Sequence, residues 1–184
     1  MRTADEAAHP GARLEQWELT MGGAFPGRVR LTLGAGGAAF LVDVDLGADG
    51  RLVVADEDVP PPRAGLDLRA DGLWTSLCCE TPFEHWTFGL EAFGLRLDEP
   101  PPPDVRWSDL VGDRLAVGYD LEWEATGAPT PLPAGDGDGY RIAGRVVGEL
   151  MTVHDRWEVA AEAVWEHWWV VRGAPAQGAL SGHP

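Results

Sequence analysis

Residues 140–171, YRIAGRVVGELMTVHDRWEVAAEAVWEHWWVV, decide whether the chain is all-β or contains a long helix. Residues 140–153 alternate between apolar and polar side chains, which is the period of a strand with one buried face. Residues 156–171 fit two patterns. The local pattern by itself slightly favours a helix, because apolar residues recur at helical spacing and Asp155 with Glu158 imitates a capping box. A strand that returns from a turn at His154-Asp155 would instead place one set of residues on a single face: Trp157, Val159, Ala161, Ala163, Trp165, His167 and Trp169.

Most of the remaining chain predicts short strands. Alternation and turn residues predict them at 28–33, 39–46, 51–55, 73–80, 84–91, 93–98 and 114–125. Asp49-Gly50 is a hairpin turn, and the prolines after Val59 and Glu99 cannot continue a sheet. Nothing requires a βαβ unit, so the pattern predicts an all-β sandwich or barrel.

Length and composition limit what this fold can hold. A chain of 184 residues is long enough for one core and too short for two ordinary domains. We expect a disordered N-terminus at 1–12, a single β domain at 13–172 and a disordered tail at 173–184. Of the adjacent Cys78 and Cys79, we expect one in the core and one outside it. With no other cysteine and no paired-histidine spacing, we expect no metal.

The charge excludes several classes of function. All 14 cationic residues are arginine, so there is no lysine for a Schiff base, a pyridoxal phosphate anchor or a P-loop, and we expect no cofactor. A net charge of −16 argues against nucleic acid and anionic membranes as partners. The chain has no apolar run that could span a bilayer and no signal-peptide pattern at its start, so we expect no membrane insertion and a cytoplasmic location.

Three stretches resemble the actinobacterial family that groups hydroxyneurosporene synthase with AttH-like, lipocalin-related proteins. They are ADGLW with CETP, EHW and GLEAFG between residues 70 and 94, GYDLEWEA at 118–125, and YRIAGRVVGE at 140–149 with its hairpin. The resemblance implies a lipocalin-like antiparallel barrel or strongly curved sandwich of about 8–10 strands, and a strand at 156–171. Where the family has an RDHSWG-type turn, His167 and Trp168 alone match. Family members usually carry two such modules and this chain has roughly one, which leaves a homodimer open.

Two short clusters carry the candidate catalytic residues. The chain repeats itself in FEHW at 83–86 and WEHW at 165–168, and His85 and His167 are candidate general acids or bases if they point into a barrel. Glu84 would then lie on the opposite face of its strand. Asp120 is a candidate proton donor if buried, although a solvated acidic face is the favoured interpretation. A structural role for the histidines stands beside the functional one.

Tryptophan is the unusual residue of this chain, with nine copies. Any single tryptophan is most simply a core residue. Nine are more than the interior of a small barrel can hold, so we expect some rings to line a pocket or an interface. The candidate substrate-binding residues are the aromatic ones on predicted strands: Trp74, Trp86, Phe88, Tyr119, Trp123, Tyr140, Trp157, Trp165 and Trp168.

These residues and the resemblance lead to one main expectation of function. It is an enzyme of secondary or isoprenoid metabolism that acts on an apolar small molecule by C=C hydration, isomerisation or cyclisation, including the pericyclase type, in a Trp-lined barrel. The alternative is a non-catalytic lipocalin-like binding protein for an apolar ligand. A structural subunit with an exposed aromatic patch is the third.

Overall fold

The computed structural model describes residue 6 and residues 8–102, 105–133 and 137–171. In this part of the chain the regular structure is almost entirely β. Two single turns of 3₁₀ helix, Gly47–Asp49 and Trp107–Asp109, interrupt it. The strands are β1 (Ala12–Met21), β2 (Gly27–Gly34), β3 (Gly37–Asp45), β4 (Arg51–Val59), β5 (Leu66–Ala70), β6 (Leu73–Thr81), β7 (His85–Leu97), β8 (Asp113–Ala125), β9 (Thr130–Pro131), β10 (Asp138–Thr152) and β11 (Arg156–Val171).

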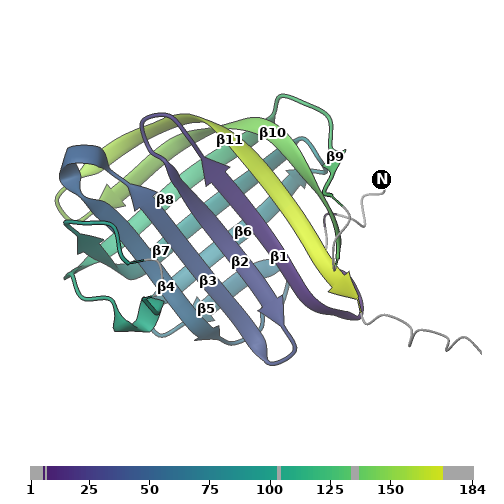
Figure 1. Ribbon diagram of the computed structural model, residues 1–184, viewed down its shortest axis with the longest axis horizontal. Helices are drawn as coiled ribbons and strands as arrows, with labels where there is room; N and C mark the ends of the chain where they lie inside the picture. The colour runs from purple at the N-terminus through teal and green to yellow at the C-terminus, as the bar shows by residue number, and fades with distance from the viewer. Residues whose placement is uncertain (1–5, 7, 103–104, 134–136, 172–184) are drawn as a thin grey trace, which may run out of the picture.

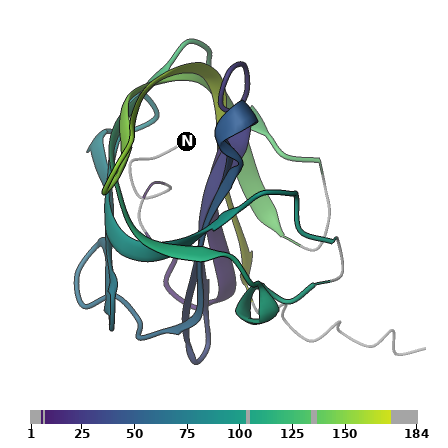
Figure 2. The ribbon, with the colours of Figure 1, turned by 90° about the vertical axis from the view of Figure 1, so that its left-hand side faces the viewer.

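The strands close into an eight-stranded antiparallel barrel (Figures 1 and 2). Its order is β4-β3-β2-β1-β11-β10-β8-β7, and the ring closes where Arg51–Val53 of β4 pairs with Leu95–Leu97 of β7. The first two thirds of β7 instead pair with β6, which continues the sheet to β5. The long strand β7 therefore belongs both to the barrel wall and to the sheet that runs on from it.

The hairpin at 140–171 confirms the all-β prediction. β10 and β11 pair in an unbroken register from Asp138 opposite Trp169 to Met151 opposite Arg156. β11 also pairs along its other edge with β1. Both backbone edges of residues 163–169 are thus paired with neighbouring strands, which a helix cannot achieve in this position, and the predicted inner face of Val159, Ala161, Ala163 and Trp165 is buried.

The strand prediction divided β7 in two and did not include β1, β5 or β9. The segments 84–91 and 93–98 form the single strand β7, because Gly94 continues the strand where β4 crosses it closely: a Cβ at Gly94 would lie 2.8 Å from the carbonyl oxygen of Val53. The strand β5 was not predicted, although Leu66 and Leu68 alternate with the polar Asp67 and Arg69.

The inner face of the barrel is a packed aromatic and aliphatic core. The largest fully buried side chains, each at most 1% exposed, are Trp17, Trp86, Trp123 and Trp165. Gly144 on β10 makes room for one of them, since a Cβ there would lie 2.3 Å from Nε1 of Trp123. These rings therefore fill the centre of the barrel.

The predicted disordered N-terminus, residues 1–12, is only partly within the described residues, since 1–5 and 7 lie outside them. Of the rest, Glu6 is 5% exposed and β1 begins at Ala12. The Oε1 atom of Glu6 accepts a hydrogen bond from the backbone N–H of Phe83 at 3.2 Å. The predicted tail at 173–184 lies outside the described residues. Among the described residues, none belongs to a helix long and apolar enough to cross a membrane.

Candidate functional site

Three buried polar side chains from three adjacent strands form one hydrogen-bonded series inside the barrel. Nε2 of His167 on β11 lies 2.7 Å from Oε1 of Glu15 on β1. Nδ1 of the same ring lies 3.3 Å from the hydroxyl of Tyr140 on β10. The exposed fractions are 0% for His167, 3% for Glu15 and 2% for Tyr140. We call Glu15, His167 and Tyr140 the relay.

The strand register places these groups together. His167 is directly opposite Tyr140 on one side and opposite Trp17 on the other. The Trp17 ring stacks on the imidazole with centroids 4.6 Å apart and planes at 16°. Because both sides of His167 are occupied by inner-face residues, its ring is held in one orientation.

With Glu15 ionised, the hydrogen bonds define where the protons of the relay lie. Both carboxylate oxygens of Glu15 accept the backbone N–H of His9, at 3.1 and 3.0 Å. A carboxylate that accepts on both oxygens takes its remaining hydrogen bond from Nε2–H of His167. Nδ1 is then the acceptor for the Tyr140 hydroxyl, which is the tautomer that a carboxylate–imidazole–hydroxyl relay requires.

Residues of the N-terminal segment cover this end of the barrel. The His9 ring stacks on Trp169 with centroids 3.8 Å apart, and it lies 5.9 Å from the ring of His167. Phe83, held by Glu6, meets the Tyr140 ring edge-on at 5.5 Å. Phe83 is the one residue other than glycine in the described chain with a positive φ, 64°, a conformation that concentrates at functional turns.

A groove on the outside of the same end begins at Phe83. It has a volume of about 710 Å³, and Phe83, Glu84, His85 and Glu124 are among its lining residues. His85 is half-buried there, with Nε2 3.9 Å from a carboxylate oxygen of Glu122. The condition set for the two histidines, that they point into the barrel, is met by His167 and not by His85. Phe83 lies between this groove and the relay.

The remaining candidates divide by the face of the sheet. Asp120 is exposed on the outer face, as the favoured interpretation held. Trp74 and Trp168 also lie on the outer face, and Trp157 lies at the opposite end, where its Nε1 donates to Asp49 at 3.1 Å. The others are buried inside, namely Trp86, Phe88, Tyr119, Trp123, Tyr140 and Trp165. Burial raises the pKa of Tyr119.

Sequence reasoning missed Glu15, Trp17 and His9. A signal for Glu15 was present, because Glu15, Trp17, Leu19 and Met21 share one parity of β1 and all are buried. A carboxylate in the apolar set of an alternating strand indicates a buried charge with a partner.

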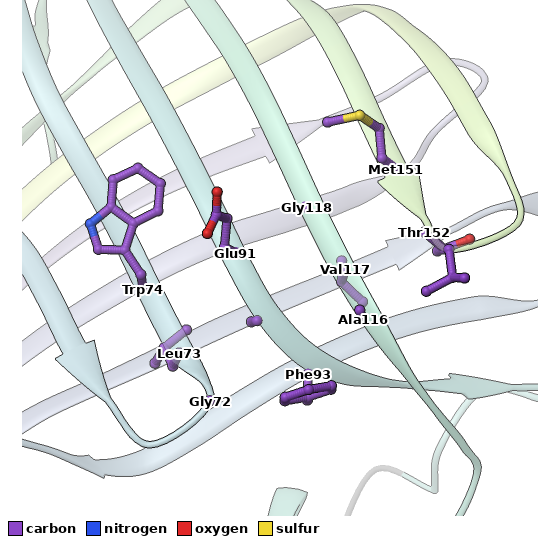
Figure 3. Close-up of a pocket in the computed structure, with 12 residues that line it drawn as sticks. Gly72, Leu73, Trp74, Glu91, Phe93, Ala116, Val117, Gly118, Met151 and Thr152 are labelled. Atoms are coloured by element: carbon purple, nitrogen blue, oxygen red, sulfur yellow. The ribbon is translucent and has the colours of Figure 1, made fainter.

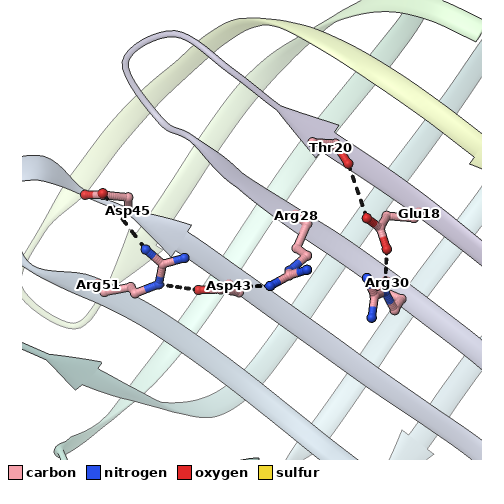
Figure 4. A network of polar contacts seen from close by, with 7 residues as sticks. All are labelled: Glu18, Thr20, Arg28, Arg30, Asp43, Asp45 and Arg51. Carbon is pink, nitrogen blue, oxygen red and sulfur yellow. Dashed lines mark hydrogen bonds and ion pairs between the residues drawn. The ribbon is translucent and has the colours of Figure 1, made fainter. Parts of the chain in front are cut away.

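A second buried carboxylate lies on the outer face of the barrel. Asp43 on β3 is 2% exposed and sits between two guanidinium groups (Figure 4). Its Oδ1 accepts from Nε of Arg51 at 2.5 Å and its Oδ2 from Nη2 of Arg28 at 3.3 Å. The hydrogen bond with Asp43 raises the pKa of Arg51, against the opposing effect of burial. Every partner of this carboxylate is a fixed cation.

No three His, Cys, Asp or Glu side chains of the described ranges gather where they could hold a metal ion. Comparison of the chain with protein-family models, with curated proteins and with solved structures finds no match.

Proposed function

We propose that the protein is an acid–base enzyme that isomerises or cyclises an apolar small molecule at the relay end of its barrel. The observation that carries this proposal is the buried series Glu15–His167–Tyr140. Its three groups can pass a proton, and aromatic rings surround it. We place this enzyme in the secondary or isoprenoid metabolism of the cytoplasm, following the resemblance to the hydroxyneurosporene synthase and AttH-like family.

The chemistry of the relay narrows the reaction. Phenol and imidazole are weak acids, so they suit removal of a proton from carbon beside a carbonyl rather than protonation of an isolated alkene. The Tyr140 oxygen takes the substrate proton while its own proton moves to Nδ1 of His167. Glu15 stabilises the imidazolium that forms. Tyr140 then returns a proton to another carbon of the enolate while the Nδ1 proton moves back to the Tyr140 oxygen, so no co-reactant is consumed; exchange of the Tyr140 hydroxyl with water before this return carries deuterium into the substrate in D₂O.

Access to the relay passes the covering residues. Tyr140 and His167 are not reached by solvent, and the rings of Phe83 and His9 lie over them. A substrate therefore enters by displacing Phe83 from the side of the groove that Glu84 and His85 line. In this proposal those two residues contact the substrate on entry and the relay performs the proton transfer.

The second candidate function is ligand binding without chemistry. Its support is the inner core, where the indole N–H groups of Trp86 and Trp165 have no hydrogen-bond partner among the described residues. A buried donor without an acceptor costs about 1–3 kcal/mol, which an acceptor on a bound ligand would recover. Such a ligand would be released chemically unchanged.

Native mass spectrometry of the purified protein, followed by incubation in D₂O, tests both candidates. The first step shows a retained small molecule and whether the chain forms a homodimer. In the second, the probe β-tetralone, an apolar ketone with acidic C–H groups, reports proton abstraction by NMR. We expect exchange that falls about 100-fold or more in Tyr140→Phe and His167→Gln.

The control variant is Asp43→Asn, which removes the outer buried charge and should keep the exchange rate. Equal rates in wild type, Tyr140→Phe and His167→Gln would overturn the enzymatic proposal. A retained molecule together with no exchange on that molecule or on β-tetralone would support the binding protein instead.

A further inference from the structure

The outer face of the sheet holds a groove that the relay does not use. It has a volume of about 580 Å³, in the range of small-molecule sites (Figure 3). One lateral row of paired residues crosses it, from Trp74 on β6 through Glu91 on β7 and Gly118 on β8 to Met151 on β10. Side chains of one row on one face are neighbours, so the register alone assembles this site.

Small residues on β8 make the hollow. Gly118 carries no side chain, and Ala116 lies one step along the same face, opposite Phe93. Trp74 and Met151 are separated by β7 and β8, which puts their strands about 14 Å apart at a spacing of about 4.8 Å per strand. That width accepts an aromatic ring or a branched alkyl group between the two walls.

The aromatic wall is fixed in place before any ligand arrives. The indole N–H of Trp74 donates to Oδ2 of Asp67 at 3.3 Å, and its ring rests on Gly89, where a Cβ would lie 3.0 Å from Cη2. Phe93 is 54% exposed, and the guanidinium of Arg114 lies 5.1 Å from its ring centroid. The groove wall thus already attracts one cation to an aromatic face.

Glu91 is the single charged residue among those that line the groove. Its carboxylate rises beside the Trp74 ring, both on the same side of the sheet (Figure 3). None of the ion pairs between described residues includes Glu91. One carboxylate among apolar walls is too few oxygens for a metal ion, which needs several hard ligands. It fits a monocation that carries hydrocarbon.

We propose that this groove binds an organic ammonium ion, with the charged nitrogen between Glu91 and the face of Trp74 and the hydrocarbon part over Ala116 and Gly118 against Met151. The carboxylate supplies the charge and a hydrogen-bond acceptor. The indole face adds cation–π attraction, which is worth most at Trp. This site is independent of the relay, so it stands or falls separately from the proposed enzyme.

Titration with 2-phenylethylammonium, followed by calorimetry and by the indole N–H signals in ¹H–¹⁵N spectra, tests the proposal. The Trp74 signal, assigned from Trp74→Phe, should shift. The neutral analogue 2-phenylethanol should bind several-fold more weakly. Glu91→Gln and Trp74→Leu should each weaken ammonium binding by about three- to fivefold, the size expected for an exposed charge and for a cation–π contact.

Two further variants separate a built site from the general attraction of an acidic protein. Ala116→Leu fills the floor and should abolish binding while leaving Glu91 in place. Glu158→Gln removes the same charge from an exposed position on β11 and should leave the affinity unchanged. Equal binding of the alcohol and the ammonium ion, or equal losses in Glu91→Gln and Glu158→Gln, would overturn the proposal.

Discussion

Glu15 and Asp43, two of the buried carboxylates among the described residues, lie on opposite faces of the barrel wall. Glu15 points inward and is 3% exposed, and Asp43 points outward and is 2% exposed. Glu15 is paired with His167 and a backbone N–H, whereas Asp43 is paired with Arg28 and Arg51. The two sites have similar burial and quite different partners.

The difference separates a site that can move a proton from one that holds strands together. Arginine stays protonated in proteins, so the Asp43 network has no proton to exchange. Imidazole and phenol side chains can each take up or release a proton, so the Glu15 series contains two groups that can exchange one. Burial of a carboxylate therefore says little about function until the titration chemistry of its partners is known.

Glu15→Ala should give the largest loss of stability. It leaves Nε2–H of His167 and the N–H of His9 without an acceptor in a site with no solvent, which we expect to cost about 3 kcal/mol in the free energy of unfolding. Urea denaturation measures it. Glu15→Gln keeps one acceptor and should lose clearly less; equal losses would show that the charge, and not the hydrogen bonds, dominates.

Asp43→Ala should cost less, about 2 kcal/mol, because the partner side chains of Asp43 are 38% and 23% exposed and water can solvate them once the carboxylate is gone. The loss should shrink further in 0.5 M salt, while that of Glu15→Ala should not, since buried pairs are screened little. Urea denaturation of both variants and the wild type at low salt and in 0.5 M salt measures these losses. A salt-independent loss at Asp43 would contradict this account.

Tyr140→Phe should destabilise the fold by about 1 kcal/mol, the usual net value of one hydrogen bond. The matched stability control is Tyr119→Phe, at the other buried tyrosine. Its loss in the free energy of unfolding should also be no more than about 1 kcal/mol. The comparison is informative because the effect on proton exchange proposed above is far larger than the effect on stability. A loss of several kcal/mol in Tyr140→Phe would make the relay a structural device.

The smallest expected effect is on the reactivity of the two cysteines, which also lie on opposite faces of one strand. Cys78 is exposed and Cys79 packs against the core, as predicted for the pair. Burial, with a smaller contribution from the negative charge of Glu6, raises the pKa of Cys79 to about 12. Alkylation at pH 8 should therefore modify Cys78 first.

The raised pKa of Cys79 also fixes the sign of a pH effect. Its contribution to stability is complete below the ordinary thiol value of 9.0 and is lost as the pH rises from there towards about 12. Stability should thus fall less between pH 8.5 and 10 in Cys79→Ala than in wild type, measured by urea denaturation. Identical slopes would show that Cys79 is as accessible as Cys78.

Much of the fold could be predicted from alternation alone. The strands near 28–33, 39–46, 73–80, 114–125 and 140–153 are present close to their predicted bounds. The ambiguous segment 156–171 could not be settled locally, because its alanines and tryptophans satisfy both periods. Two pairing partners, β1 and β10, decide it, and β1 lies more than a hundred residues away in the chain.

The candidate site could likewise be predicted only where its residues are close in the sequence. His167 and Tyr140 were named, and the hairpin register brings them to opposite positions. Glu15 was not named: its place in the apolar set of β1 was a local signal of a buried charge, but its partner His167 is 152 residues away. His85 was a candidate only if it pointed inward, and Trp86, not His85, has the inward parity on β7.

The sequence by itself determined which side chains share a face of each strand, because the alternation of a strand is a local property of its backbone. It also determined the chemistry that is absent, from the missing lysines and the charge of −16. Only the tertiary structure decided which strands are neighbours. Barrel closure brings Glu15, Tyr140 and His167 together inside and lines up Trp74, Glu91 and Met151 outside, because strand order and register depend on contacts between distant parts of the chain.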